Sequence, residues 1–262
     1  MLSAGQRGTQ TLLDYPGLVM EAPAEDQIRL LDVQALDTKL ARLAHQRRTL
    51  PVLARLAELE QLIGEADRNR VITATRASDL AREVIKAETD VDQVRTRAAR
   101  NQARVDAGTL TPKDTEAVVN ELALLARRQD DLEEVQLALM EEHEAAQQEA
   151  AAAAATLEQL TAERTERLAE RDRQLKDIEQ QARSILADRA KAITGLDAGL
   201  VELYERLRKQ RSGLGAAALR AKRCEGCRTE LSPVDLAKAM AAPSNQIVRC
   251  EECSRILVRV AE

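Results

Sequence analysis

Four cysteines, arranged as two Cys-x-x-Cys pairs near the C-terminus, constrain the fold of this chain more than any other feature. The pairs are Cys224 with Cys227 and Cys250 with Cys253, and the sequence has no other cysteine. Each pair can form a tight turn, and the segment between them has only to run out and back for four thiolates to surround one Zn²⁺ tetrahedrally. The spacing therefore predicts one zinc ion per chain, bound by these four residues.

Two other uses of the cysteines remain open at this point. A redox-active pair normally stands alone at the start of a helix that follows a buried strand, and neither pair has that context. Two disulfides would need an oxidising compartment. No secretory signal peptide is recognisable, so we expect a reducing environment and a cytoplasmic protein.

The composition predicts a mostly α fold built from coiled coil. The chain has no Phe, no Trp and only two Tyr, and 32% of its residues are charged. Long helices that meet along a narrow apolar stripe have this composition, whereas a large mixed core needs more aromatic residues. No apolar run approaches the roughly twenty residues of a membrane span, so we expect a soluble protein without a membrane partner.

Heptad spacing of apolar residues predicts a long antiparallel coiled-coil hairpin over residues 26–194. Its bend is expected at residues 106–112, where Gly108 can end one helix, Thr111 can cap the next and Pro112 can open it. The register is interrupted at Pro51 in the outgoing arm and slips by four residues after Arg164 in the return arm. The two irregularities face each other if the chain bends near residue 109, which favours pairing of the arms within one chain.

The remaining segments divide into three. Residues 1–25 are expected to be a disordered leader, with the alternative that Met20 is the native start. Residues 195–213 are expected to hold a linker helix, and residues 214–262 a small β-rich zinc ribbon. Within the ribbon we expect strands at 214–219, 246–249 and 255–260, and a short helix from Ser232-Pro233 to about Met240.

The cysteine-containing segments resemble those of bacterial coiled-coil proteins that end in a C4-type zinc ribbon. The specific part is Cys224-Glu225-Gly226-Cys227 together with Cys250-Glu251-Glu252-Cys253-Ser254-Arg255-Ile256-Leu257, and the resemblance covers about residues 26–262. It implies a regulator that contacts transcription machinery, nucleic acid or secretion components, without catalysis. The family usually has Gly where this chain has Ser254, a position that often takes a left-handed backbone.

Charge is distributed unevenly along the chain. Residues 200–262 carry 12 Lys and Arg against 8 Asp and Glu, which leaves 27 against 36 in residues 1–199. Residues 206–223 hold seven basic side chains and no acid, and such a run beside a zinc ribbon can follow phosphates. The seven are Arg206, Arg208, Lys209, Arg211, Arg220, Lys222 and Arg223.

Two functions are therefore compatible with the sequence. The first is a nucleic-acid-binding or transcription-associated regulator that uses these seven basic side chains. The alternative is a protein–protein scaffold in which the coiled coil docks a helical partner and the basic run only solubilises a linker. We find no nucleophile–base constellation and no phosphate-binding glycine loop, so we expect neither an enzyme nor a small-molecule substrate.

Overall fold

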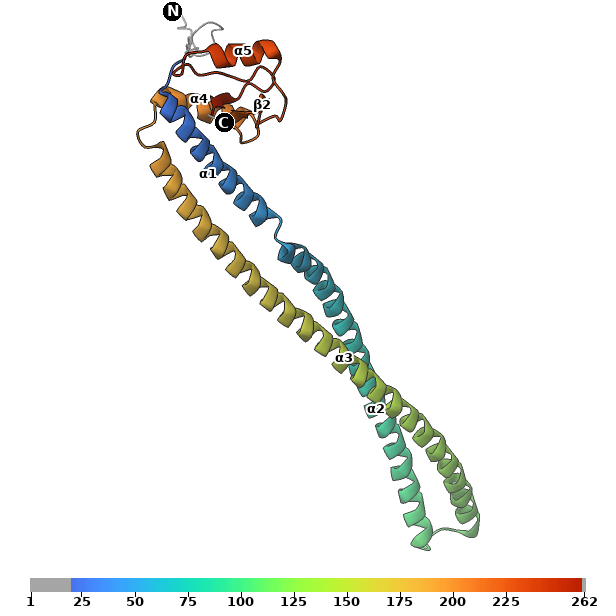
Figure 1. Cartoon of the computed structure of the whole chain (residues 1–262). Coiled ribbons are helices and arrows are strands. Elements are labelled where there is room, and N and C mark those ends of the chain that lie inside the picture. The colour runs from blue at the N-terminus through green and yellow to red at the C-terminus, as the bar shows by residue number, and fades with distance from the viewer. Residues whose placement is uncertain (1–19, 261–262) are drawn as a thin grey trace, which may run out of the picture. The chain divides into compact units, whose positions relative to one another are not determined.

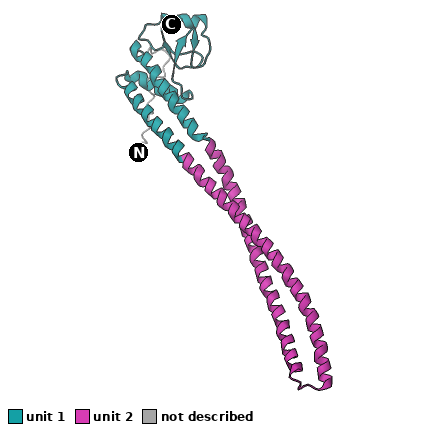
Figure 2. Ribbon diagram, turned by 60° about the horizontal axis from the view of Figure 1, so that its bottom comes forward, with its two compact units in different colours: residues 1–50, 172–262 teal, residues 51–171 magenta. Residues whose placement is uncertain are grey.

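The computed structural model describes residues 20–260, which form two compact units (Figures 1 and 2). Residues 51–171 form the first, called here the hairpin unit. Residues 20–50 and 172–260 form the second, called here the ribbon unit. The ribbon unit is thus discontinuous in sequence, because the hairpin unit is inserted between its two segments.

The hairpin unit consists of α2 (Pro51–Asp106) and the first part of α3 (Pro112–Ile193). Gly108 has a φ of +65°, which glycine adopts without strain, and it follows the end of α2. The Thr111 hydroxyl accepts a hydrogen bond of 3.2 Å from the Asp114 N–H and so caps α3. The two helices run antiparallel, as the heptad pattern predicts.

A narrow apolar seam joins the two arms of the hairpin unit. The buried apolar residues are Val52, Leu59, Leu80, Val84, Ala87 and Val91 on α2, and Val118, Ala146 and Ala153 on α3. Their intervals of three, four or a multiple of seven residues are those of a coiled-coil seam. Asn101 is buried in the same seam at 7% exposure, and its Nδ2 has no hydrogen-bond partner among the described residues.

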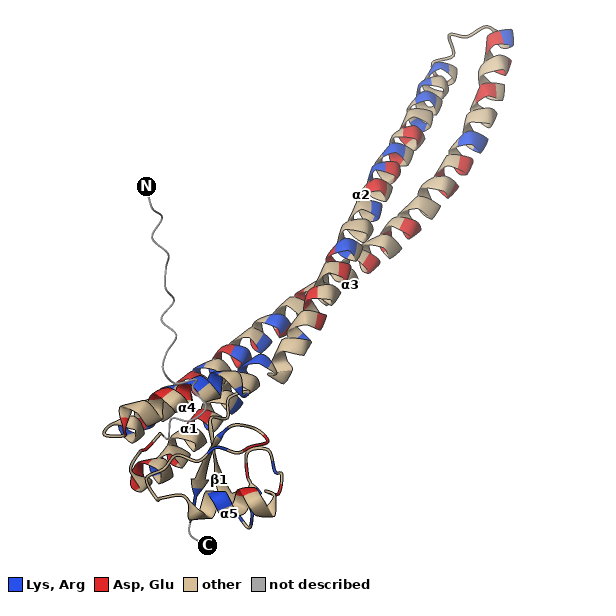
Figure 3. Cartoon of the chain, turned by 90° about the horizontal axis from the view of Figure 1, so that it is seen from above, with Lys and Arg blue, Asp and Glu red and all other residues tan. Residues whose placement is uncertain are grey.

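Charged residues of both signs flank this seam along α2 and α3 (Figure 3). Arg55 donates to Glu163 across the arms at 2.9 and 2.8 Å, and Arg95 donates to Glu133 at 2.7 Å. The hydrogen bonds from Arg55 lower the pKa of Glu163. Such ion pairs help to set which residues of the two arms face each other. They add little stability, because exposed ion pairs contribute about 0–1 kcal/mol each.

The ribbon unit combines helices and a small sheet. Its helices are α1 (Ala24–Arg48), the end of α3, α4 (Ala198–Gln210) and α5 (Pro233–Ala241). The sheet has the order β2-β1-β3, with strands β1 (Ala216–Arg220), β2 (Arg223–Cys224) and β3 (Ile256–Arg259). β1 is antiparallel to β2 and parallel to β3. Figure 1 shows these elements gathered around the first turns of α1.

One shared core holds α1, α4 and the sheet together. It includes Leu30 and Val33 from α1, Tyr204 from α4, and Ile256 and Val258 from β3, all of them at most 1% exposed. Gln34 on α1 reinforces the joint, because its Oε1 accepts the Gly215 N–H at 2.8 Å and its Nε2 donates to the Gly213 carbonyl at 3.1 Å. The sheet of the zinc ribbon therefore shares one hydrophobic core with α1 and α4.

Two sequence expectations need correction within this unit. Residues 20–25 do not belong to a disordered leader: Ala22 is buried, the Met20 carbonyl accepts the Ile247 N–H at 2.9 Å, and α1 begins at Ala24. Residues 1–19, including the rest of that predicted leader, lie outside the described residues. The segment 246–249, predicted to be a strand, forms only isolated bridges. Gln246 pairs with Glu21 and Arg249 pairs with Ile256, so the segment has no single partner strand along its length.

Candidate functional site

The two Cys-x-x-Cys segments form turns with the same hydrogen-bond pattern. In the first, the Arg228 N–H donates to the Cys224 carbonyl at 2.7 Å, and the Cys224 N–H donates to the Thr229 carbonyl at 3.0 Å. In the second, the Ser254 N–H donates to the Cys250 carbonyl at 2.7 Å, and the Cys250 N–H donates to Arg255 at 3.0 Å. The two turns therefore present their cysteines in equivalent ways.

The residue after each second cysteine has a left-handed backbone. Arg228 has a φ of +63° and Ser254 a φ of +58°. Left-handed conformations cost non-glycine residues about 1–2 kcal/mol, so each turn holds a strained residue. Ser254 thus takes a left-handed conformation without being glycine, and the second turn keeps the hydrogen-bond pattern of the first.

The four cysteine sulfurs come together at one point, with every pair of Sγ atoms within 4.8 Å. Cys224 Sγ lies 3.9 Å from Cys253 Sγ, and Cys227 Sγ lies 3.9 Å from Cys250 Sγ. Four thiolates at about 2.3 Å from a tetrahedral Zn²⁺ are separated by about 3.8 Å, so the cluster has the size that one zinc ion requires. The sulfurs are too far apart for a disulfide, whose S–S length is about 2.05 Å.

Protonation of the cluster depends on burial. Desolvation raises the pKa of the Cys224 thiol and raises that of Cys250 to about 12. Desolvation also acts on Cys227, but hydrogen bonds involving Thr229 outweigh it and lower the pKa of that thiol to about 6. Buried thiols of this kind lose their protons when a metal ion binds, which couples zinc binding to proton release.

A second small core supports the cluster from the sheet side. Ala217 and Leu219 of β1, Leu257 of β3 and Ala239 of α5 are buried beside the cysteines. Gly226, inside the first turn, lies so close to this layer that a Cβ atom would come within 2.9 Å of Arg255 Cδ and 3.0 Å of Ala217 Cβ. The position therefore requires glycine for close approach.

The fold separates the seven basic residues predicted to bind nucleic acid. Arg220, Lys222 and Arg223 lie together on the turn between β1 and β2, where all three are exposed. Lys209 and Arg211 are exposed at the C-terminal end of α4, and Arg206 is half-buried on the same helix. The run is acid-free in sequence only, because Glu225 Oε1 lies 3.7 Å from Arg220 Nε.

Arg208 has a structural role that sequence reasoning missed. Its Nη2 donates to Glu205 at 3.0 Å, and its Nη1 lies 3.4 Å from Asp37 Oδ1. Asp37, on α1, is 3% exposed and also accepts two hydrogen bonds from Arg189 at 2.6 and 3.0 Å. Arg208 is thus engaged in a charge network around the buried Asp37, and its predicted phosphate contact stays a prediction.

The same network contains Tyr204, one of the two tyrosines of the chain. Burial, together with its hydrogen bond to Asp37, raises the pKa of the Tyr204 hydroxyl. Desolvation acts to raise the pKa of Glu205, but hydrogen bonds from Arg189 and Arg208 lower it. The isolated aromatic residue Tyr204 among charged helical residues is the feature of the sequence that indicates a buried contact here. The heptad pattern does not identify Asp37 as its partner.

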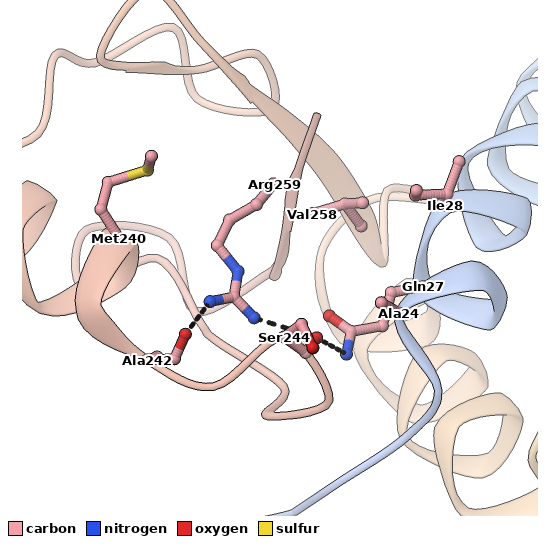
Figure 4. Close-up of a pocket in the computed structure, with 8 residues that line it drawn as sticks. All are labelled: Ala24, Gln27, Ile28, Met240, Ala242, Ser244, Val258 and Arg259. Carbon is pink, nitrogen blue, oxygen red and sulfur yellow. Dashed lines mark hydrogen bonds between the residues drawn. The ribbon is translucent and has the colours of Figure 1, made fainter. Parts of the chain in front are cut away.

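A small recess lies where α1 meets the ribbon, with a volume of about 290 Å³ (Figure 4). Its walls include Ile28, Val258 and Met240, and Arg259 forms its polar side. The Arg259 guanidinium donates to five main-chain carbonyls between residues 239 and 246. Both Nη atoms of Arg259 therefore serve to hold the loop after α5.

Within the described part of the chain, no helix is both long enough and apolar enough to cross a bilayer. The many charged residues along α2 and α3 explain this result.

Comparisons with known proteins place the two parts of the chain in known families. Residues 33–212 match the model of the CT398-like coiled-coil hairpin domain, and residues 223–257 match the model of the C4-type zinc ribbon domain. The second match contains all four clustered cysteines. Neither model describes a catalytic domain.

Individual relatives agree with this assignment. Two Mycobacterium tuberculosis proteins, MT2288 of strain CDC 1551 and Rv2229c of strain H37Rv, are each 32% identical over 241 residues, which cover 92% of this chain and 98% of the relative. A solved structure from Mycobacterium smegmatis is 34% identical with a TM-score of 0.80, covering 92% of this chain and all of that one.

The structure of CT398 from Chlamydia trachomatis shares the fold at 19% identity and a TM-score of 0.62, covering 90% of this chain and 98% of that one. The hairpin match spans well over half of this chain, and the ribbon match follows it directly. This chain therefore belongs to the family of CT398-like coiled-coil hairpin proteins that carry a C4-type zinc ribbon binding one Zn²⁺.

Proposed function

We propose that this protein is a non-enzymatic regulator whose zinc ribbon binds the phosphate backbone of nucleic acid through the turn between β1 and β2. In this proposal Cys224, Cys227, Cys250 and Cys253 are the zinc ligands and have a structural role. The observation that carries the proposal is the clustering of Arg220, Lys222 and Arg223 on this turn, beside the cysteine cluster.

Two features of this turn destabilise the protein when no ligand is bound. Arg220 and Arg223 face each other directly in the register of β1 and β2, and like charges in that arrangement repel. Ala221 and Lys222, the two residues between them, have φ values of +45° and +66°, which Gly or Asn would adopt at lower cost. A polyanion that binds the turn would remove the charge repulsion.

Neighbouring groups modulate this basic turn without neutralising it. The ion pair between Arg220 and Glu225 is exposed and 3.7 Å long, so it is weak. Lys209 and Arg211 lie at the end of α4, and the Arg211 carbonyl accepts a hydrogen bond of 3.2 Å from Arg255 Nη2. Arg255 in turn lies close to Gly226 in the first cysteine turn, so Arg211 borders the ribbon.

Electrophoretic mobility shift or fluorescence anisotropy with generic duplex and single-stranded nucleic acid tests the proposal. Binding should fall as salt rises, because each neutralised phosphate on duplex DNA releases about 0.9 of a counterion. Replacing Arg220, Lys222 and Arg223 with Ala should flatten the log–log salt slope by roughly one unit per lost contact. Replacing Arg68, Lys86 and Arg100 of α2 with Ala removes the same charge elsewhere and should leave the slope unchanged.

A protein scaffold is the second candidate function, and exposed apolar side chains on the hairpin unit favour it. Ile72 is 67% exposed, Leu124 65% and Ile85 61%, although all three lie on helices with a narrow seam. If the wild-type protein binds no nucleic acid at about 50 mM salt, where charge contacts are strongest, the scaffold becomes the better explanation.

A further inference from the structure

An apolar groove separates α1 from the end of α3 within the ribbon unit. It has a volume of about 810 Å³ and lies between residues 40–48 and residues 175–186. Its apolar lining residues are Leu40, Leu43, Ala44, Leu175, Ile178, Ala182 and Leu186. The two helices run side by side here, so the groove follows their length (Figure 1).

The groove exists because α1 and α3 bury only part of each other's apolar stripe. Leu43 and Ile178 are buried against the opposite helix, at 9% and 6% exposure. Leu186 remains 53% exposed, and Leu40 and Leu175 are only half-buried. A third apolar surface is needed to complete the burial of this layer, as in a three-helix bundle.

The charge at the rim of the groove is positive. Arg47 and Arg48, in the last turn of α1, are both exposed and form no ion pair with any residue that the structure describes. Glu179 is the one acidic residue among those lining the groove in the described chain, and it already accepts a hydrogen bond of 2.6 Å from Arg183. The rim therefore favours an acidic partner, although the protein as a whole has a net charge of −5.

We infer that this groove docks an acidic amphipathic helix of a partner protein. Residues 175–186 extend over about 16 Å, or three helical turns, at about 1.5 Å per residue. A helix of that length would insert apolar residues spaced three and four apart between the two stripes. Its Asp or Glu side chains would face Arg47 and Arg48.

Three designed peptides of about 18 residues can test this inference against the full-length protein. They share one leucine face and differ only in their flanks, which carry Glu, Gln or Lys. The Glu peptide should bind about tenfold more tightly than the Gln peptide, because two exposed ion pairs are lost, and the Lys peptide should bind more weakly still. Fluorescence anisotropy at two salt concentrations gives the affinities.

Variants of the protein locate the binding site. Leu186→Asp should abolish binding of the Glu peptide, whereas Ile85→Asp, at an even more exposed position on α2, should not change it. Arg47→Glu with Arg48→Glu should reverse the preference toward the Lys peptide. Circular dichroism verifies that each variant keeps its helices.

Other outcomes would overturn the inference. Equal binding of the Glu and Lys peptides, unchanged binding by Leu186→Asp, or no binding of any peptide at millimolar concentration would each exclude an acidic helix in this groove. If Leu186→Asp instead converts a dimer into a monomer in analytical ultracentrifugation, the groove is covered by a second copy of this chain.

Discussion

The Tyr204 hydroxyl donates a hydrogen bond of 2.7 Å to Asp37 Oδ2 in the interior of the ribbon unit. Tyr204 is fully buried and Asp37 is 3% exposed. The two residues are 167 positions apart in sequence, and this contact joins α1 to α4. Because Asp37 also accepts from Arg189, its carboxylate is the common acceptor that links α1, α3 and α4.

Truncating this pair should separate a hydrogen-bond effect from a charge effect. Tyr204→Phe should lower the free energy of unfolding by about 1–2 kcal/mol, since Asp37 keeps its arginine partners. Asp37→Leu should cost about 3–5 kcal/mol, because it removes the buried carboxylate that Tyr204, Arg189 and Arg208 share and leaves two arginines with Glu205 alone. Thermal unfolding monitored by zinc release reports on this unit, and Asp32→Asn, an exposed change on α1, is the control. Equal losses for both variants would contradict the role given to Asp37.

Removing zinc should loosen more than the ribbon segment itself. The purified protein should contain about one zinc per chain, and structural zinc contributes on the order of 10 kcal/mol to folding of its domain. Because Leu30 and Val33 share a core with Ile256 and Val258, chelation should raise hydrogen exchange in α1 and α4 as well as in residues 214–260. The hairpin unit should keep its exchange protection and most of the helical circular-dichroism signal. Loss of most helicity would contradict the division into two units.

The strained turn at Ser254 offers a gain in zinc retention. Ser254→Gly should stabilise the second cysteine turn by about 1 kcal/mol. The substitution removes the cost of a left-handed serine, and the greater flexibility of glycine in the unfolded chain offsets part of that gain. Zinc transfer to a chromogenic chelator should then require a several-fold higher chelator concentration. Ser254→Ala removes the hydroxyl but keeps the Cβ atom, so it should leave zinc retention near the wild-type value. Identical behaviour of the two variants would mean that the turn holds no strain.

The hairpin unit should lose stability in acid through Glu163. Hydrogen bonds from Arg55 lower the pKa of this carboxyl in the folded state below its ordinary value of about 4.3. Its contribution is therefore present above pH 4.3 and disappears as the pH falls through the folded-state pKa. Glu163→Gln should reduce the midpoint of thermal unfolding at pH 7 and make it less sensitive to acid between pH 5 and pH 3. Glu65→Gln, an exposed change on the same unit, should do neither.

Asn101 should be replaceable by an apolar residue with a gain in stability. Its Nδ2 is buried without a partner in the described structure, and leaving a buried donor unpaired costs about 1–3 kcal/mol. Asn101→Leu should raise the unfolding midpoint of the hairpin unit in urea, while Asn69→Leu, at an exposed position, should have little effect. The gain should be accompanied by weaker register specificity, measured as additional disulfide cross-links between cysteine pairs placed out of register.

Local patterns were sufficient to predict much of this structure. The heptads located the seam residues Leu80 and Val91, and the cysteine spacing identified a cluster whose geometry depends on a few adjacent residues. The helix after Ser232-Pro233 followed from its capping residue, and Ser232 Oγ accepts the Asp235 N–H at 3.1 Å. Each of these predictions rests on interactions between residues that are close in sequence.

Interactions between distant segments were not predictable in this way. The acid-free run of residues 206–223 gives no sign that Arg208 pairs with Asp37, which lies 171 residues earlier on another helix. Residues 20–25 lack any periodic pattern, yet they are ordered by hydrogen bonds to the ribbon. The groove between residues 40–48 and 175–186 depends on how far two correctly predicted helices separate, which a heptad pattern does not specify.

The discontinuous ribbon unit also sets the order in which the protein can be completed on the ribosome. Leu30 and Val33 are made before the hairpin unit, but their core partners Ile256 and Val258 are made after it. At about 5–20 residues per second, α1 must wait roughly 10–45 seconds for those partners, while the inserted hairpin unit can already pair its own arms. Zinc capture, which needs Cys253, therefore follows synthesis of the whole hairpin unit, and until then α1 lacks the core that buries Leu30 and Val33.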